Sequence, residues 1–445
     1  MKVYNKLVTA PKGFARAVDN GFQEGRADLF DVLHAETLMG QADLIQGLSD
    51  ELKDVVADVL EGTEVVREVA YKLARSTADD LGPLCHAASL IRSLGKGTEV
   101  SFSPKVFIPL TRMCRDSCAY CTFRQIPQET ERLYMSPDEV VAVAQAGERS
   151  GCTEALFTLG ERPEQRYPEA KEWLNRRGYK TTIGYLRDMC ELVIQESSLS
   201  PHANPGTMSY TEMRSLSEVN VSMGLMLENV SERLYALGGP HEFAPSKRPR
   251  VRLKSIKIAG ELKVAFTTGI LIGIGETYEE RIESILAIRR LQNRFGHIQE
   301  VIVQNFRRKP NTAMAMADEP STRDLLWTVA VSRLLLGPNM NIQVPPNLSA
   351  SDYDLALLAG INDWGGISPL TIDYVNPEAP WPYMEELRDK TESLGFTLRP
   401  RLPIYPEFIQ SDNGFLPTSL RDRTLALVDD EGYTKGGIDR YARRI

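Results

Sequence analysis

The sequence predicts an α/β fold, a (βα)8 TIM-type barrel that follows an N-terminal helical region. Two observations carry this prediction. Short apolar runs alternate with stretches that have apolar residues at helical spacing, which is typical of repeated βα units around a parallel sheet. Small and polar residues follow the runs, where the loops of a barrel carry its chemistry. We therefore expect a functional site at the carboxyl ends of the strands.

The chain is expected to divide into three parts, with a first boundary near the Gly-Lys-Gly-Thr segment that ends at Thr98. Within residues 1–98, segments 44–52 and 64–74 have apolar residues three and four positions apart, which predicts amphipathic helices. Residues 99–406 form the predicted barrel, and residues 407–445 form a short polar C-terminal tail.

Eight runs are the predicted strands of the barrel. They are Lys105–Thr111, Glu154–Leu159, Leu199–Ala203, Val221–Leu227, Ala265–Ile272, Ile298–Phe306, Asn341–Val344 and Gly360–Trp364. Helix starts are expected between them at Ser136 and Thr277, because each hydroxyl is followed three residues later by a glutamate, as in a capping box.

Composition is that of an ordinary globular protein, with 42% hydrophobic and 25% charged residues among 445. The net charge of -8 gives no reason to expect a nucleic-acid partner, which requires a basic surface. The N-terminus has no apolar signal-like segment, and no run approaches the roughly 20 apolar residues of a membrane helix. We expect a cytoplasmic protein that contacts no membrane.

The strongest chemical signal is a Cys-x3-Cys-x2-Cys run, formed by Cys114, Cys118 and Cys121 at the end of the first predicted strand. Three thiolates can hold a four-iron cluster and leave one iron open, whereas simple electron carriers use four cysteines. A zinc site is the alternative, but it needs a fourth ligand, and Cys85 and His86 lie far upstream. Six cysteines in this pattern do not suggest a disulfide framework.

This run, with Tyr120 before the last cysteine, resembles the signature of the radical S-adenosylmethionine (SAM) enzymes. The resemblance implies a 4Fe-4S cluster with three cysteine ligands, Cys114, Cys118 and Cys121, and a fourth iron site open to SAM. It also implies reductive cleavage of SAM to methionine and a 5′-deoxyadenosyl radical. Tyr120 is expected beside the cofactor.

Other segments resemble SAM-binding elements of the same superfamily. Gly160-Glu161 follows the second predicted strand and resembles the glycine-rich element whose acid binds the SAM ammonium, although such a pair is often only a surface loop. The fifth strand carries Gly269, Ile272 and Gly273, which resemble the element that meets adenine; a buried strand is the simpler reading. Glu228 is either a contact to the ligand or a solvated acid at a helix start.

Candidates for substrate chemistry lie at other strand ends. His202, Asn305 and Asp363 are the candidate catalytic residues, and the amides Gln304 and Asn347 could contact a polyhydroxylated or uracil-like substrate. Buried amides can equally tie barrel loops together. The cysteines outside the triplet, Cys85, Cys152 and Cys190, are expected in the core, so no ligands for an auxiliary cluster are apparent.

Whole segments also resemble one family, the CofG subunit of 7,8-didemethyl-8-hydroxy-5-deazariboflavin synthase. They are residues 106–123, 156–164, 297–306 and 360–369, within a similarity that spans residues 102–406. The resemblance implies a lyase of coenzyme F-420 biosynthesis that closes the deazaflavin ring of a tyrosine-derived uracil adduct with loss of ammonia. It implies a CofH-type partner subunit that makes the adduct, since this chain has one cysteine triplet, and an electron donor such as a ferredoxin or flavodoxin.

Two other interpretations stay open from the sequence. One is a different radical SAM enzyme, of the CofH, menaquinone-pathway or biotin-synthase type. The other is a zinc or electron-transfer protein that turns over no substrate.

Overall fold

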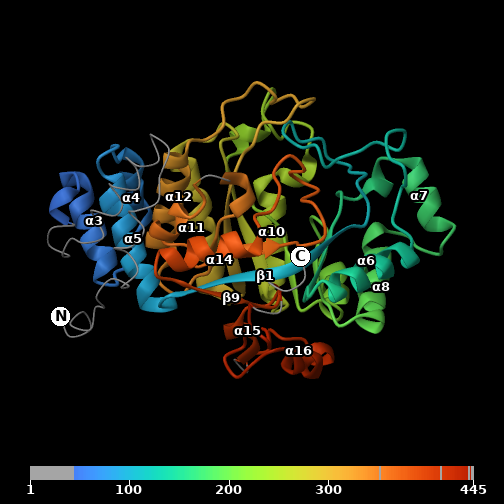
Figure 1. Cartoon of the computed structure of the whole chain (residues 1–445). Helices are drawn as coiled ribbons and strands as arrows, with labels where there is room; N and C mark the ends of the chain where they lie inside the picture. The colour runs from blue at the N-terminus through green and yellow to red at the C-terminus, as the bar shows by residue number, and fades with distance from the viewer. Residues whose placement is uncertain (1–44, 350–351, 411–412, 439–440, 442–445) are drawn as a thin grey trace.

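The computed structural model describes residues 45–349, 352–410, 413–438 and 441 (Figure 1). In this part of the chain, parallel strands form one sheet that closes on itself inside a layer of helices. The strands are β1 (Glu99–Pro109), β2 (Glu154–Thr158), β3 (Ser200–Asn204), β4 (Ser222–Gly224), β5 (Phe266–Ile272), β6 (Ile298–Asn305), β7 (Ile342–Gln343), β8 (Asp363–Ile367) and β9 (Thr397–Pro400).

The first eight strands form a closed barrel, as predicted. Their order is β2-β3-β4-β5-β6-β7-β8-β1, and β1 also pairs in parallel with β2, from Lys105 beside Glu154 to Pro109 beside Thr158. A closed parallel barrel collects the carboxyl ends of all its strands at one rim. The loop that carries the cysteine triplet begins at that rim, directly after β1.

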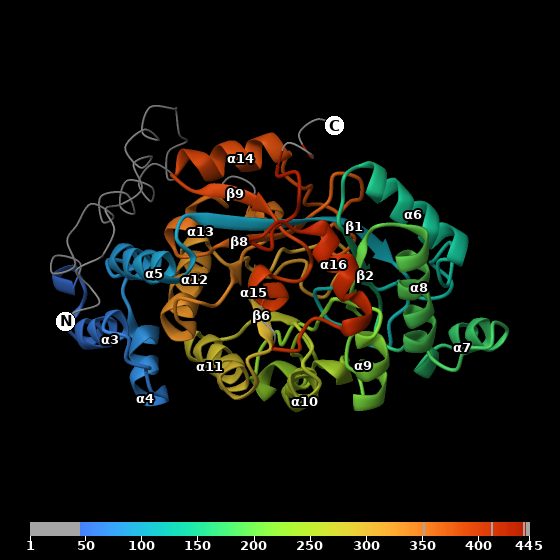
Figure 2. The same cartoon turned by 90° about the horizontal axis from the view of Figure 1, so that it is seen from below.

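Helices alternate with the strands and surround the barrel when it is viewed along its axis (Figure 2). They are α6 (Pro137–Arg149), α7 (Pro168–Asn175), α8 (Thr182–Glu196), α9 (Tyr210–Ser217), α10 (Pro249–Glu261), α11 (Tyr278–Phe295), α12 (Thr322–Leu336), α13 (Leu355–Leu358) and α14 (Met384–Ser393). The predicted capping boxes are present at Ser136 of α6 and Thr277 of α11. Each hydroxyl accepts a hydrogen bond from the backbone amide of the glutamate three residues on.

Alternation along β1 separates the helix-facing core from the barrel interior. Val106 lies against α6, so closely that a Cβ on Gly147 would approach Val106 to 2.8 Å. Phe107, the next residue, packs instead with Phe123 and Leu156 in a small separate cluster. Successive side chains of a strand point to opposite faces. The interior face of β1 therefore carries Lys105 and Phe107 toward the barrel axis.

The N-terminal helices pack on one side of the barrel, against α12 (Figure 2). They are α3 (Asp50–Leu60), α4 (Arg67–Ala70) with a 3-10 turn at Tyr71–Arg75, and α5 (Leu81–Lys96). Arg289 of α11 donates a hydrogen bond to the Val65 carbonyl at 2.7 Å and ties this region to the barrel. Helices were predicted here, but their bounds differ, and Leu44 lies outside the described residues.

The segment after the barrel adds a strand and a base that the sequence did not predict. β9 pairs in parallel with the first residues of β1, and the helices α15 (Pro406–Gln410) and α16 (Arg421–Leu427) follow it. Apolar side chains of this segment, including Phe408 and Leu420, pack with Val221 and Ala265 at the starts of β4 and β5. Figure 2 shows α15 and α16 across the lower end of the barrel.

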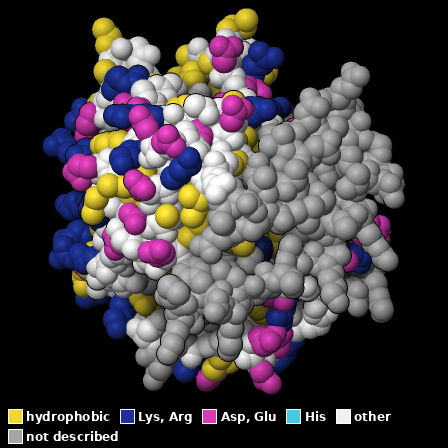
Figure 3. All heavy atoms as spheres, turned by 90° about the vertical axis from the view of Figure 1, so that its left-hand side faces the viewer, with side chains coloured by type: hydrophobic (Ala, Val, Ile, Leu, Met, Phe, Trp, Pro, Cys, Tyr) yellow, Lys and Arg dark blue, Asp and Glu magenta, His cyan; other side chains and the backbone are white. Residues whose placement is uncertain are grey.

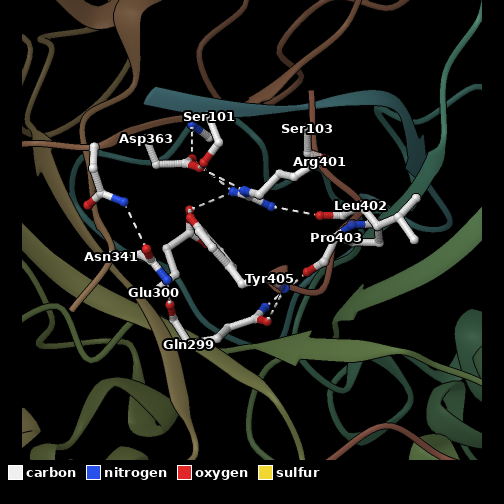
Figure 4. Close-up of polar contacts among 12 residues, drawn as sticks. Ser101, Ser103, Gln299, Glu300, Asn341, Asp363, Arg401, Leu402, Pro403 and Tyr405 are labelled. Atoms are coloured by element: carbon white, nitrogen blue, oxygen red, sulfur yellow. Dashed lines mark hydrogen bonds and ion pairs between the residues drawn. The ribbon is translucent and has the colours of Figure 1, made fainter. Parts of the chain in front are cut away.

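Buried charges close the same end (Figure 4). Arg401 donates hydrogen bonds to both carboxylate oxygens of Asp363, at 2.7 and 2.8 Å, and to Glu300 at 3.1 Å. The Tyr405 hydroxyl donates to Glu300 at 3.0 Å, and Ser101 hydrogen-bonds Asp363. Burial raises the pKa of Glu300 to about 7, because the Arg401 charge offsets the loss of hydration only in part and the Asp363 carboxylate adds to the rise.

This arrangement corrects the predicted position of the eighth strand. The expected run Gly360–Trp364 begins too early, because residues up to Leu358 are helical and Gly360 turns the chain with a φ of 102°. Asp363 consequently begins β8 and lies at the base of the barrel, at the end opposite the cysteine loop.

The outer face over the N-terminal helices carries interspersed basic and acidic side chains in its described part (Figure 3). In the described residues, no helix combines the length and the apolar character that crossing a membrane would require.

Candidate active site

A cavity of about 350 Å³ opens at the carboxyl ends of the strands. Each of the eight barrel strands contributes at least one lining residue, among them Lys105, Leu156, Asn204, Gly224, Thr267, Gln304, Gln343 and Gly366. The loops after β1, β2, β3, β4, β7 and β8 complete the wall. A cavity of this size and position is the usual location of a ligand site in a barrel.

All three cysteines of the triplet line this cavity. Neighbouring loops hold their loop in place: Ser117 N donates to Phe243 O, and Ala119 N donates to Pro240 O, both at 2.9 Å. Burial raises the pKa of Cys118 to about 12, although Lys247 lowers it in part. Coordination to a metal can ionise such a buried thiol.

The donor set fits a cluster of several irons that three cysteines hold. Within the described part of the chain, no three His, Cys, Asp or Glu side chains lie close enough to share one metal ion. Cys85 and His86, the residues that a zinc site would have to recruit, are buried in α5 and do not line the cavity. Cys152 and Cys190 are also buried, as predicted for core thiols.

Gly160 and Glu161, after β2, pack directly on the cysteine loop. A Cβ at Gly160 would lie 1.9 Å from the Met113 carbonyl oxygen, so only glycine allows this approach. The Glu161 amide donates a hydrogen bond to Cys114 Sγ at 3.2 Å, and its carbonyl accepts from Arg115 N at 2.7 Å. The resemblance placed these residues beside the cofactor, and the structure brings them to the cysteines.

The Glu161 carboxylate is buried at the edge of the cavity. It accepts hydrogen bonds from Thr207 N at 2.9 Å and Thr207 Oγ1 at 2.6 Å, and Gly206 leaves space for it. Burial raises the pKa of Glu161, and the two hydrogen bonds only partly offset that effect. A fixed, desolvated carboxylate can bind an ammonium group strongly.

Glu228, Lys247 and Arg252 form a buried charged group on the same wall. Glu228 follows β4 with a φ of 65°, an uncommon conformation outside glycine. It pairs with Lys247, and Arg252 lies 3.9 Å away. Burial alone would raise the pKa of Glu228, but these two cations outweigh burial and lower it. Of the two sequence interpretations of Glu228, the structure excludes the solvated one.

Tyr120 lies against a residue that the sequence analysis missed. Its hydroxyl is 3.0 Å from His241 Nε2, and burial, followed by Lys247, lowers the pKa of His241 to about 3. His241 and Lys247 belong to the long loop after β4, whose path no local sequence pattern indicates.

The fifth-strand residues have mainly structural contacts. Gly269 allows β5 to approach Ile302 of β6, and Ile272 is in the core. Gly273 turns the chain with a φ of 88°, and its amide donates to Glu276 at 2.8 Å. None of these three residues lines the cavity, so their contact with the cofactor remains a prediction.

The three candidate catalytic residues do not meet. His202, which lies within the third predicted strand, is in β3, where its Nδ1 is 2.7 Å from Ser222 Oγ and burial lowers its pKa. Asn305 donates to the Leu348 carbonyl at 3.1 Å. Asp363 is at the base of the barrel, and none of the three lines the cavity. Asn347 likewise ties loops, through Asp373, whereas Gln304 does line the cavity.

Comparison with known proteins decides the family. A model described as the radical SAM superfamily matches residues 108–288, which include the cysteine triplet, Glu161 and Glu228. The chain is 55% identical over 336 residues to the 7,8-didemethyl-8-hydroxy-5-deazariboflavin synthase of Methanopyrus kandleri, covering 76% of this chain and all of that protein. The chain belongs to this synthase family.

Longer relatives, which carry the name FO synthase, match as well. The FO synthase of Nocardia farcinica is 48% identical over 380 residues, covering 83% of this chain and 44% of that protein. The FO synthase of Mycobacterium tuberculosis H37Rv is 45% identical over 400 residues, covering 86% of this chain and 47% of that protein. This chain therefore spans just under half the length of those relatives.

Solved structures resemble the fold at low sequence identity. The hydrogenase maturase HydG of Carboxydothermus hydrogenoformans has a TM-score of 0.63 at 18% identity, covering 86% of each chain. Methylornithine synthase PylB has a TM-score of 0.61 at 18% identity, covering 77% of this chain and 97% of that one. The family membership implies a 4Fe-4S cluster and SAM as cofactors.

Proposed function

We propose that this protein is a radical SAM carbon–nitrogen lyase that forms 7,8-didemethyl-8-hydroxy-5-deazariboflavin, in coenzyme F-420 biosynthesis. Its substrate would be 5-amino-5-(4-hydroxybenzyl)-6-(D-ribitylimino)-5,6-dihydrouracil, which cyclises with loss of ammonia. The observation that carries this proposal is a cysteine triplet on a strand-lined cavity, in a chain 55% identical to the whole of a protein with that synthase name.

Cys114, Cys118 and Cys121 would hold the cluster, with SAM at its open iron. When bound, the cluster and SAM supply an electron and an organic radical able to remove a hydrogen atom from the substrate. The protein's own residues would bind and orient the cofactor and the substrate, and they would exclude water from the site. Glu161 would accept the ammonium of the methionyl group, and Tyr120 would support the cofactor from the cysteine loop.

A second protein would have to supply the adduct. Since the longer FO synthases contain about as much additional sequence as this chain, we propose a CofH-type partner that makes the adduct. An electron donor such as a ferredoxin or flavodoxin would reduce the cluster.

The test is anaerobic reconstitution with iron and sulfide, followed by reduction with SAM and the hydroxybenzyl-uracil adduct. We expect 5′-deoxyadenosine, methionine and the fluorescent deazaflavin. Cys118→Ala should abolish cluster absorbance and product, because two thiols cannot hold the cluster, whereas the buried Cys152→Ala should retain both.

The results separate the alternatives. Deoxyadenosine without deazaflavin would indicate a different radical SAM reaction. If the native protein shows no cluster absorbance and forms no deoxyadenosine, both enzyme interpretations are contradicted. Iron retained at full occupancy in Cys118→Ala would contradict the ligand assignment.

A further inference from the structure

Polar side chains with no hydrogen-bond partner face the cavity on the side away from the β2 to β5 loops. They are Lys105 of β1, Gln304 of β6 and Gln343 of β7. Among the described residues, none donates a hydrogen bond to these three side chains or accepts one from them. Lys105 and Gln343 are buried, and Gln304 is partly buried. Polar groups away from solvent are normally satisfied, so three open ones around one space suggest that a ligand completes them.

Two glycines of β8 create that space. β8 lies between β7 and β1 in the barrel, and Gly365 and Gly366 stand where side chains would otherwise fill the gap. A Cβ at Gly365 would lie 1.9 Å from Gln343 Nε2, and one at Gly366 would lie 2.4 Å from Lys105 Cδ. The glycine pair therefore lets the lysine and the glutamine extend across the strand between them.

Lys105 is an unusual residue to place there. Its side chain is buried, and no salt bridge joins it to a described carboxylate. Its ammonium lies 4.8 Å from the centroid of the Trp381 ring and 5.7 Å from that of Phe107. An ammonium loses hydration when it is buried, and aromatic faces restore only part of that stabilisation. The site is therefore built at a cost to stability, as functional sites often are.

The charged neighbours do not neutralise Lys105 fully. Burial lowers the pKa of Lys105, and Glu154, Asp373 and Glu300 offset this only in part, while Arg401 adds to it. Asp373 is already engaged, since it accepts hydrogen bonds from Asn347 and Asn376, both at 3.0 Å. The ammonium keeps its donors for something that enters the cavity.

We infer that Lys105, Gln304 and Gln343 form the subsite for the pyrimidine-dione ring of the substrate, with Lys105 donating to a ring carbonyl oxygen. This deepens the proposed function and rests on it. Such a ring has an edge of alternating carbonyl and N–H groups. An ammonium offers only donors, and a glutamine amide offers a donor and an acceptor, which together match that edge. Phe107 and Trp381 supply apolar faces for a flat ring.

Binding of separate substrate fragments tests this subsite independently of turnover. The reconstituted holoenzyme would be titrated anaerobically with 5-amino-6-(D-ribitylamino)uracil and, separately, with p-cresol as a probe of the phenol part. Lys105→Met keeps the aliphatic stem but removes the charge. We expect the uracil to bind about ten-fold more weakly, because one charge-assisted hydrogen bond is lost. Binding of p-cresol should be unchanged. Gln343→Leu should act in the same direction.

Lys96→Met is the matched control, because Lys96 is also a largely buried lysine but pairs with Glu407 at 3.0 Å, outside the cavity. It should bind the uracil as the native protein does.

The unfolding temperature of Lys105→Met should be no lower than that of the native protein, because the substitution removes an unpaired buried charge. If Lys105 served only to stabilise the fold, the substitution would lower the unfolding temperature.

The outcomes distinguish the two levels of proposal. The subsite would be overturned if Lys105→Met bound the uracil with unchanged affinity, or if only p-cresol binding became weaker. Deazaflavin formation by the native protein would still support the proposed function in that case. Uracil binding that depends on Lys105, without deazaflavin formation, would support the subsite and contradict the ring-closing reaction. Absence of uracil binding to the native holoenzyme would overturn the subsite.

Discussion

Single residues decide how closely the loops of this site approach one another. Gly160 is the clearest case, because the atom in the way of any larger side chain is a backbone carbonyl, Met113 O, which cannot rotate aside. The same contact brings the Glu161 amide to Cys114. A substitution at Gly160 therefore acts on the geometry of the cysteine loop.

We expect Gly160→Ala to incorporate less than half of the native iron, because a Cβ at 1.9 Å from Met113 O must displace the loop. Iron and sulfide analysis after reconstitution measures this. Gly184→Ala is the control: a Cβ there would meet Thr181 Oγ1 at an ordinary 3.4 Å, within helix α8. Native iron content in Gly160→Ala would show that the loop adapts.

Site residues could be predicted where neighbouring positions in the sequence form the functional group. The triplet and the Gly160-Glu161 pair could be found because a short spacing or a strand end marks them. Lys105, His241 and Lys247 could not, because their roles depend on which strand lies beside β1 and on the path of the loop after β4. A lysine inside an apolar run was the available signal for Lys105.

At the level of elements, periodicity located the barrel strands but not their ends. Seven of the predicted runs overlap their strands, since each is a short apolar segment between turns, although β1 begins at Glu99, six residues before its predicted run. The eighth was displaced because the apolar residues before Gly360 are helical, and apolar runs alone do not separate a buried helix from a strand. That displacement moved Asp363 from the expected mouth to the base.

The Arg401 contacts make the segment after β9 part of the barrel. Arg401→Met should lower the free energy of unfolding by about 3–5 kcal/mol, because it leaves Asp363 and Glu300 buried without their cation. Urea denaturation of the apoprotein measures this. Arg399→Met, two residues earlier, removes partly exposed ion pairs and should cost less than about 1 kcal/mol. Equal losses in the two variants would contradict the assigned role.

For the whole molecule, the C-terminal segment is a structural base for the barrel. Its sequence is polar on average, so it was predicted as a tail, and the division at residues 98 and 406 remains a prediction. The apolar residues that matter, such as Phe408, Ile409 and Leu420, are few and irregularly spaced. They become recognisable only once the barrel exists and leaves Val221 and Ala265 to be covered.

Phe408→Ala should lower the free energy of unfolding by about 3–4 kcal/mol, because it opens a cavity under the barrel. Leu425→Ala, on α16, removes a side chain that is 43% exposed and should change stability little. Thermal unfolding followed by circular dichroism compares them. If both variants melt like the native protein, the segment does not support the barrel.

The closed base also determines the order in which ligands can enter. Lys105 lies within β1, whereas Cys114 follows its end, so a ring held at Lys105 sits deeper than a ligand held at the cysteines. Arg401 and the helices below it block the other end. If the pyrimidine binds at Lys105 and SAM at the cysteines, as proposed, both ligands would enter through the mouth, the pyrimidine before SAM. A high concentration of SAM should consequently slow turnover, by occupying the entrance before the deeper ligand has arrived.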